Sequence, residues 1–127
     1  MAAILDHIGL GYADYDKAKS FFSRALAPLG IGPVMEVGEG GDRACGFGRG
    51  KPDFWIAGGG RTSPHIHVAF VAENRAAVRA FYEAALEAGG TDNGPPGIRA
   101  HYHPDYYGAF VLDPEGQNIE AVCHRPE

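Results

Sequence analysis

Hydrophobic residues recur at helical spacing in two stretches of the chain. The first set is Ala18, Phe21, Phe22, Ala25, Leu26 and Leu29, and the second is Val78, Phe81, Tyr82, Ala85 and Leu86. Steps of three and four residues place each set on one face of a helix. Asp14 and Asn74 precede the sets as N-caps, because their side-chain oxygens can accept hydrogen bonds from first-turn amides. Gly30 and Gly90 are expected to end the helices, since glycine adopts the left-handed C-terminal conformation without penalty.

Short apolar runs between glycine and proline clusters predict strands around each helix. One strand precedes each helix, at 4–10 and at 66–71. Three strands follow each helix, at 34–37, 43–48 and 54–57 in the first half and at 98–101, 108–112 and 118–122 in the second. The connections 48–52 and 113–117 are predicted hairpin turns. Each half is therefore predicted to fold as β-α-β-β-β.

The two halves match at an offset of 60 residues without a gap through the first strand and the helix. His7 falls on His67, and Gly30 falls on Gly90. Two unrelated amphipathic helices would share apolar spacing by chance, but that alternative does not explain the matched histidines and glycines. We therefore predict an α+β fold in which residues 1–127 form a single domain of two modules, approximately 1–60 and 61–127.

Composition narrows the classes of function. The chain has 127 residues and a formal net charge of -5, with acidic and basic residues interspersed, so no basic stripe favours nucleic acid. No apolar run is long enough for a membrane span, and the first ten residues lack the basic start of a signal peptide. We expect a cytoplasmic protein. Cys45 and Cys123 are read as reduced core residues, with a disulfide or a redox pair as the alternative.

Three side chains suggest a metal site. The repeat should bring His7 and His67 opposite each other, and the small residues Gly9 and Ala69 on the same strand faces leave room beside them. Glu120 lies in an apolar run, where a buried carboxylate is costly unless it is paired, protonated or bound to a metal. Taken singly, each residue is more often structural or solvated. Together they form a common ligand set for zinc, iron, manganese, cobalt or nickel.

Two further regions are candidates for substrate binding. Trp55 corresponds to Glu120 at an offset of 65 residues, so it should line the same cleft between the two modules. There it could stack on a flat substrate, together with Phe47. Core packing is the alternative for Trp55. The segment 97–110 has the composition of a substrate-facing loop, although an interface or capping loop fits equally. Its candidates are Arg99 as a carboxylate ligand, His103 as a proton donor or acceptor, and Tyr102, Tyr106 and Tyr107 as hydrogen-bond donors or stacking groups. His65 and His124 receive no role.

The segments DHIGL (6–10), HIHVAF (65–70) and DPEGQNIEAV (113–122) resemble the vicinal oxygen chelate superfamily over nearly the whole chain. That superfamily contains glyoxalase I, extradiol dioxygenases, epimerases and bleomycin-resistance proteins. The resemblance implies an open, cupped mixed sheet with the helices outside, and His7, His67 and Glu120 as ligands of a divalent metal, with Glu120 also catalytic. Trp55 departs from the glyoxalase I pattern, which has a fourth ligand there.

Two classes of function follow from this resemblance. The first is a metal-dependent lyase, isomerase or dioxygenase acting on a small substrate with neighbouring oxygens. The second is a metal-free protein that binds an antibiotic or another small molecule by stacking. In both, exposed sheet edges favour a homodimer.

Overall fold

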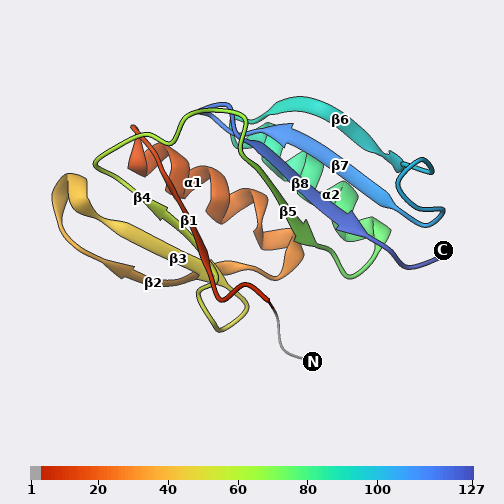
Figure 1. The fold of residues 1–127 in the computed structure, drawn as a ribbon, viewed down its shortest axis with the longest axis horizontal. Helices are drawn as coiled ribbons and strands as arrows, with labels where there is room; N and C mark the ends of the chain where they lie inside the picture. The colour runs from red at the N-terminus through yellow and green to blue at the C-terminus, as the bar shows by residue number, and fades with distance from the viewer. Residues whose placement is uncertain (1–3) are drawn as a thin grey trace.

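The computed structural model describes residues 4–127, which form two four-stranded mixed sheets with one helix each (Figure 1). The first module contains β1 (Ile8–Gly11), α1 (Tyr15–Ala25), η1 (Ala27–Leu29), β2 (Gly32–Val37), η2 (Gly40–Asp42), β3 (Ala44–Gly48) and β4 (Phe54–Ala57). The second contains β5 (His67–Val71), α2 (Arg75–Glu87), β6 (Thr91–Ile98), β7 (Tyr107–Leu112) and β8 (Asn118–Cys123). The predicted β-α-β-β-β order is confirmed in both halves.

Both sheets have the same topology. Their strand orders are β1-β4-β3-β2 and β5-β8-β7-β6, and the first strand of each module is parallel to the last. Gly9 pairs with Trp55, and Ala69 pairs with Glu120. Because Gly9 and Ala69 are equivalent in the repeat, this register makes Trp55 the structural counterpart of Glu120, as the sequence predicted.

The helices begin as predicted, but they end differently. Asp14 accepts a hydrogen bond from the Lys17 amide, and Asn74 accepts one from the Ala77 amide. Gly30 is left-handed, with φ 75°, after the short helix η1. After α2 the left-handed residue is Gly89, with φ 106°. The Gly90 amide donates a hydrogen bond to the Ala85 carbonyl at 2.8 Å and so closes the turn. The second helix therefore ends on a Schellman-type turn one residue earlier than the repeat suggested.

The predicted strand at 98–101 is wrong. β6 runs from Thr91 to Ile98, through a stretch rich in proline and glycine that reads as a loop. It is an edge strand that pairs only with β7, and its register slips twice, between Asp92 and Gly94 and between Gly94 and Gly97. Proline is tolerated there because an edge strand does not need every amide for its ladder.

The helices cover one face of both sheets and pack against each other, while the opposite face stays open (Figure 1). The core between helices and sheets draws on both modules. Phe54 of β4 meets Phe70 of β5 with ring centroids 5.1 Å apart, and Phe21 of α1 reaches Gly90, where an added Cβ would lie 2.9 Å from its ring. β1 and β5 are edge strands of the two separate sheets, and no strand pairing joins them. No helix in residues 4–127 has the length and apolar character needed to cross a membrane.

Buried hydrogen bonds join the modules at the end of β1. The Tyr12 hydroxyl donates to Asp113 Oδ2 at 2.5 Å, and Asp113 Oδ1 accepts from the amides of Glu115 and Gln117. Asp113 is 4% exposed, and burial raises the pKa of its carboxyl. The Tyr12 bond links the first module to the β7–β8 turn of the second, and the two amide bonds hold Asp113 in that turn, so Asp113 ties the modules together at this point.

Replacing Asp113 by Ala should therefore destabilise the protein strongly. Loss of the buried acceptor leaves three donors without a partner and should lower the free energy of unfolding by about 2–4 kcal/mol. Urea denaturation followed by circular dichroism measures the change. Asp16→Ala is the matched control: Asp16 is exposed and forms only a surface ion pair with Arg43, so the expected loss is below about 1 kcal/mol. Equal losses in the two variants would contradict this role of Asp113.

Candidate functional site

Glu120 is fully buried although its side chain points to the open face of the second sheet. Its neighbours Ile119 and Ala121 on β8 belong to the core under α2, so strand alternation turns Glu120 the other way. β8 lies between β5 and β7, and both neighbouring strands can therefore place side chains around this carboxylate.

His67 of β5 is the first partner of Glu120. Its Nε2 atom lies 2.8 Å from Glu120 Oε1, and about half of the imidazole side chain (48%) remains exposed. The Phe110 ring of β7 stands beside the imidazole, with centroids 6.0 Å apart. Gly108, also on β7, leaves the space that the second oxygen needs, because a Cβ there would lie 3.0 Å from Glu120 Oε2. Neither Phe110 nor Gly108 carries a sequence signal beyond strand alternation, and the sequence analysis missed both.

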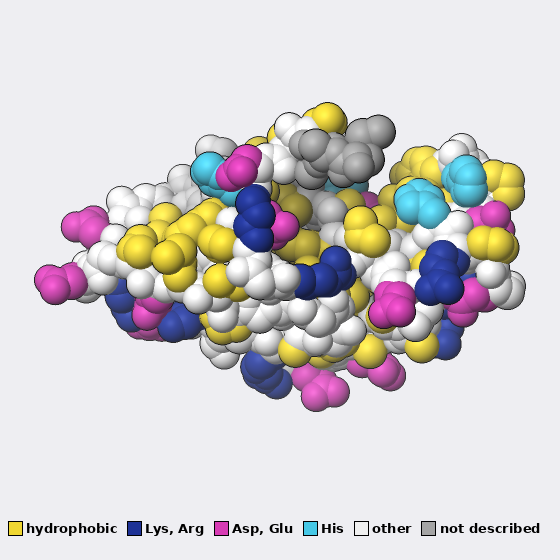
Figure 2. Space-filling view, turned by 90° about the horizontal axis from the view of Figure 1, so that it is seen from below, with side chains coloured by type: hydrophobic (Ala, Val, Ile, Leu, Met, Phe, Trp, Pro, Cys, Tyr) yellow, Lys and Arg dark blue, Asp and Glu magenta, His cyan; other side chains and the backbone are white. Residues whose placement is uncertain are grey.

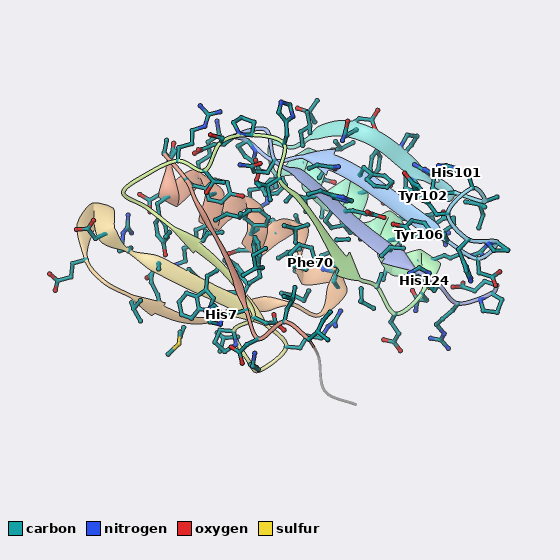
Figure 3. All side chains as sticks on the ribbon, in the orientation of Figure 1. His7, Phe70, His101, Tyr102, Tyr106 and His124 are labelled. Carbon is teal, nitrogen blue, oxygen red and sulfur yellow. The ribbon has the colours of Figure 1, made fainter. Side chains whose placement is uncertain are left out.

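Tyr106 is the second partner of Glu120. Its hydroxyl donates to Glu120 Oε2, and burial, followed by this hydrogen bond, raises the pKa of Tyr106 well above its usual value. Tyr102 and His124 pack edge-on against the Tyr106 ring, at centroid distances of 5.0 and 5.1 Å. Figure 3 shows these side chains, with His101, gathered at one end of the second sheet. His124, which received no role from the sequence, thus supports the group that holds Glu120.

The charge of Glu120 has few partners. Among residues 4–127 its only ion-pair partner is His67, and no lysine or arginine reaches it. A carboxylate removed from water in this way needs a compensating positive charge. His67 Nε2 and Glu120 Oε1 are close enough to contact one divalent ion together. The chemistry of these two donors therefore fits a metal.

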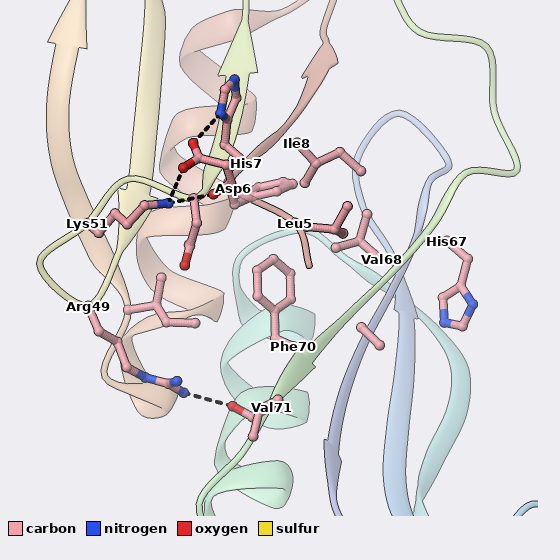
Figure 4. Close-up of a pocket in the computed structure, with 14 residues that line it drawn as sticks. Leu5, Asp6, His7, Ile8, Arg49, Lys51, His67, Val68, Phe70 and Val71 are labelled. Atoms are coloured by element: carbon pink, nitrogen blue, oxygen red, sulfur yellow. Dashed lines mark hydrogen bonds and ion pairs between the residues drawn. The ribbon is translucent and has the colours of Figure 1, made fainter. Parts of the chain in front are cut away.

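His7 lies apart from this pair. It precedes β1 on the first module, its Nδ1 is 2.7 Å from Asp6 Oδ1, and Asp6 in turn is 3.5 Å from Lys51. Figure 4 shows His7 and His67 on opposite sides of the groove between the modules. Within residues 4–127, no three side chains of the His, Cys, Asp and Glu types converge as a metal site. One chain thus brings two of the three predicted ligands together.

The remaining aromatic candidates occupy different surroundings. Trp55 is partly exposed on the open face of the first sheet, where its ring covers Gly46 and its Nε1 donates to the Pro52 carbonyl at 3.2 Å. Phe47 is 0% exposed and packs against Phe22 and Phe54 under α1, so it offers no surface to a ligand.

Three polar candidates of the segment 97–110 also lie outside the Glu120 pair. Tyr107 turns toward the helix side, where its hydroxyl accepts from Arg79. His103 is exposed, and its Nδ1 accepts from the Asp105 amide. Arg99 donates to the carbonyls of Gly97 and Pro95 and lies over Phe110, with 5.3 Å from its Cζ to the ring centroid. Of the tyrosines predicted in this segment, Tyr106 is the one that contacts Glu120.

The paired β-α-β-β-β modules with a histidine and a glutamate on the open face define a class of two-module α+β proteins. The profile of the Glyoxalase/Bleomycin resistance protein/Dioxygenase superfamily matches residues 4–121, and the chain belongs to that superfamily. The predicted resemblance and the α+β two-module fold are thereby confirmed. Among proteins with curated descriptions, none matches the chain.

Solved structures agree with this assignment. A glyoxalase/bleomycin resistance protein from Albidiferax ferrireducens T118 is 29% identical, with a TM-score of 0.79 over 98% of this chain and 100% of its own. A glyoxalase/bleomycin resistance protein/dioxygenase family enzyme from Burkholderia phytofirmans PsJN is 18% identical, with a TM-score of 0.71 over 97% and 100%. The E144Q mutant of glyoxalase I from Zea mays is 18% identical, with a TM-score of 0.68 over 93% of this chain and 46% of that protein. The last two show the fold alone.

The contact between Tyr106 and Glu120 can be tested by titration. In Glu120→Gln, the pKa of Tyr106 should fall part of the way toward its usual value, because the negative charge beside its hydroxyl is lost while burial persists. Nuclear magnetic resonance of ring-labelled tyrosine follows Tyr106, with Tyr106→Phe identifying its signal. The signal of Tyr107, on the other face of the sheet, is the internal control. A Tyr106 pKa unchanged by Glu120→Gln would contradict the contact.

Proposed function

We propose that the protein is a small metal-dependent enzyme of the glyoxalase/dioxygenase type, acting on a small substrate with two neighbouring oxygens. The observation that carries the proposal is the fully buried carboxylate of Glu120 beside His67 Nε2, without a lysine or arginine partner in residues 4–127. A divalent ion, which can be zinc, iron, manganese, nickel or cobalt, would supply Lewis-acid stabilisation for charge on those oxygens. The reaction is then a lyase, isomerase or dioxygenase reaction.

The surrounding side chains have distinct tasks in this proposal. His67 and Glu120 hold the ion, and Tyr106 holds the second carboxylate oxygen, which fixes the orientation of Glu120. Phe110 walls the imidazole side of the site. Tyr102 and His124 pack on Tyr106 and keep its hydroxyl directed at Glu120. His103, which is exposed and packs against His124 beside Tyr106, is the proposed proton donor or acceptor.

We further propose a homodimer in which His7 of a second copy supplies the third ligand. Glu36 of β2 points to the helix side, where it contacts Tyr15 and Lys19, so Met35 and Val37 point to the open face. These two side chains are each 48% exposed, and Val71 on the open face of β5 is 65% exposed. Figure 2 shows hydrophobic side chains gathered over the first module, on the left. Covering this apolar surface favours association with a second copy.

The buried free thiols of Cys45 and Cys123 suit a cytoplasmic protein.

A metal-free binding protein is the second candidate. It is favoured by Trp55, which stands where the repeat would otherwise provide a fourth donor, and by the two-donor set within residues 4–127. Trp55 on the first sheet and Tyr102 with Phe110 on the second would then stack on a flat ligand. Such a protein does not depend on His7 or Glu120.

Metal analysis distinguishes the two candidates. Protein loaded with zinc, cobalt or manganese and then desalted should retain about one ion per chain if His67 and Glu120 are ligands. His67→Ala and Glu120→Gln should both lose the ion, because the first removes the imidazole donor and the second replaces the charged carboxylate by a weaker, neutral amide. His65→Ala is the matched control, since His65 lies two residues from His67 but outside the Glu120 pair, and it should keep the ion. Equal retention by all four proteins would overturn His67 and Glu120 as ligands, and a wild type that retains no ion would favour the metal-free candidate.

Mixing variants tests whether the site is shared between chains. Neither His7→Ala nor His67→Ala should bind the ion alone. A heterodimer of the two variants has two sites. One site contains both substitutions. The other is intact, because the His67→Ala chain supplies its His7 and the His7→Ala chain supplies its His67 and Glu120. Refolding the two variants together should therefore restore binding in a fraction of the sites, measured by metal content after gel filtration. A mixture that stays without metal, while the wild type refolds with it, would overturn the shared site.

A further inference from the structure

A groove of about 420 Å³ runs between the modules, alongside β5 and the residues that lead into β1 (Figure 4). Its apolar lining comes from both modules, with Ile8, Ile31 and Phe54 on one side and Val68 and Phe70 on the other. His67, which contacts Glu120, also lines it. His67 borders the groove from the far side of β5, because strand alternation turns its imidazole away from Val68 and Phe70 (Figure 4). The apolar lining suits an elongated apolar ligand.

Arg49 lines this groove, and within residues 4–127 its cation has no carboxylate partner. Its Nε donates to the Leu29 carbonyl at 3.0 Å, and its Nη2 donates to the Val71 carbonyl at 2.7 Å. No acidic side chain within residues 4–127 forms an ion pair with it. The two carbonyls belong to different modules, so the guanidinium is held in place before any ligand arrives. A fixed, uncompensated guanidinium is a strong site for a carboxylate.

The other charged groups of the groove differ from Arg49. Lys51 donates to the Asp6 carbonyl at 2.6 Å and lies 3.5 Å from the Asp6 carboxylate, which also holds His7. Asp53 lines the groove without an ion-pair partner among residues 4–127, so its charge opposes the binding of an anion. Arg49 and Asp53 should thus affect a bound anion in opposite directions, and Lys51 should affect it less than Arg49.

The two ends of the groove are well separated along β5. His67 stands at the start of this strand, and Val71, whose carbonyl holds Arg49, stands at its end. Four residue steps in a strand span roughly 13 Å. A ligand held at Arg49 by an anionic group can therefore extend an apolar body along β5, past Phe70 and Val68.

We propose that the groove binds an elongated apolar carboxylate, with its carboxylate on Arg49 and its apolar chain along Val68 and Phe70. This assignment rests on Arg49 and the apolar lining alone, so it can be tested without a metal.

The probes are octanoate and 1-octanol, titrated calorimetrically into protein stripped of metal with EDTA. Octanoate should bind more tightly than octanol, and Arg49→Gln should weaken octanoate by about tenfold or more while leaving octanol unchanged. Asp53→Asn should tighten octanoate binding, and Lys51→Gln should change it less than Arg49→Gln does. From hexanoate to octanoate, each added methylene should improve affinity by about fourfold until the groove is filled.

The controls separate this proposal from the metal site. Unchanged octanol binding shows that the groove of Arg49→Gln is intact, and Asp53→Asn tests the charge effect without removing a contact between modules. Equal losses in Arg49→Gln and Lys51→Gln would reveal a general charge effect and overturn the proposal. Failure of octanoate to bind the wild type would overturn it as well. If the wild-type protein binds octanoate but retains no metal after loading, the metal-dependent function is rejected and the carboxylate site stands.

Discussion

The burial of one carboxylate on an otherwise open sheet face is the constraint on which the site depends. Glu120 has no exposed surface, and it is surrounded by an imidazole from β5, a phenol from the segment before β7, and a glycine on β7 that leaves room for its oxygen. Burying such a group costs free energy that an apolar residue would not require. The protein bears this cost at one strand position, which is the expected sign of a site selected for binding or chemistry rather than for stability.

Duplication of the module explains where this site lies and why only one half carries it. At equivalent registers the first sheet has Trp55 beside Gly46, and the second has Glu120 beside Phe110. In the first sheet the large aromatic ring is on the last strand and glycine is on the strand beside it. In the second sheet the ring, Phe110, is on the neighbouring strand β7, and the last strand β8 carries the carboxylate. The first module thereby presents an apolar face, and the second presents a polar one.

Much of the fold could be predicted because it depends on local chemistry. The N-caps, the apolar helix faces and the alternation around Glu120 each follow from short-range rules, and the repeat gave the register of Trp55. Two errors arose where tertiary context overrides local preference. The strand β6 tolerates its prolines only because it is a sheet edge, and the turn after α2 places the left-handed residue at Gly89 because Gly90 has to pack against Phe21. The position of His7 could not be predicted, because it depends on how the helices set one module against the other. Arg49 has no sequence signal, since its two carbonyl partners belong to distant segments.

The central claim is that Glu120 and His67 form one metal-binding unit. A crystal of the protein soaked in zinc and measured at the zinc absorption edge tests it most directly. An anomalous peak is expected about 2.0–2.2 Å from both His67 Nε2 and Glu120 Oε1, with a further imidazole in the coordination sphere. Glu120 still hydrogen-bonded to His67, with zinc absent from this position or bound elsewhere, would contradict it.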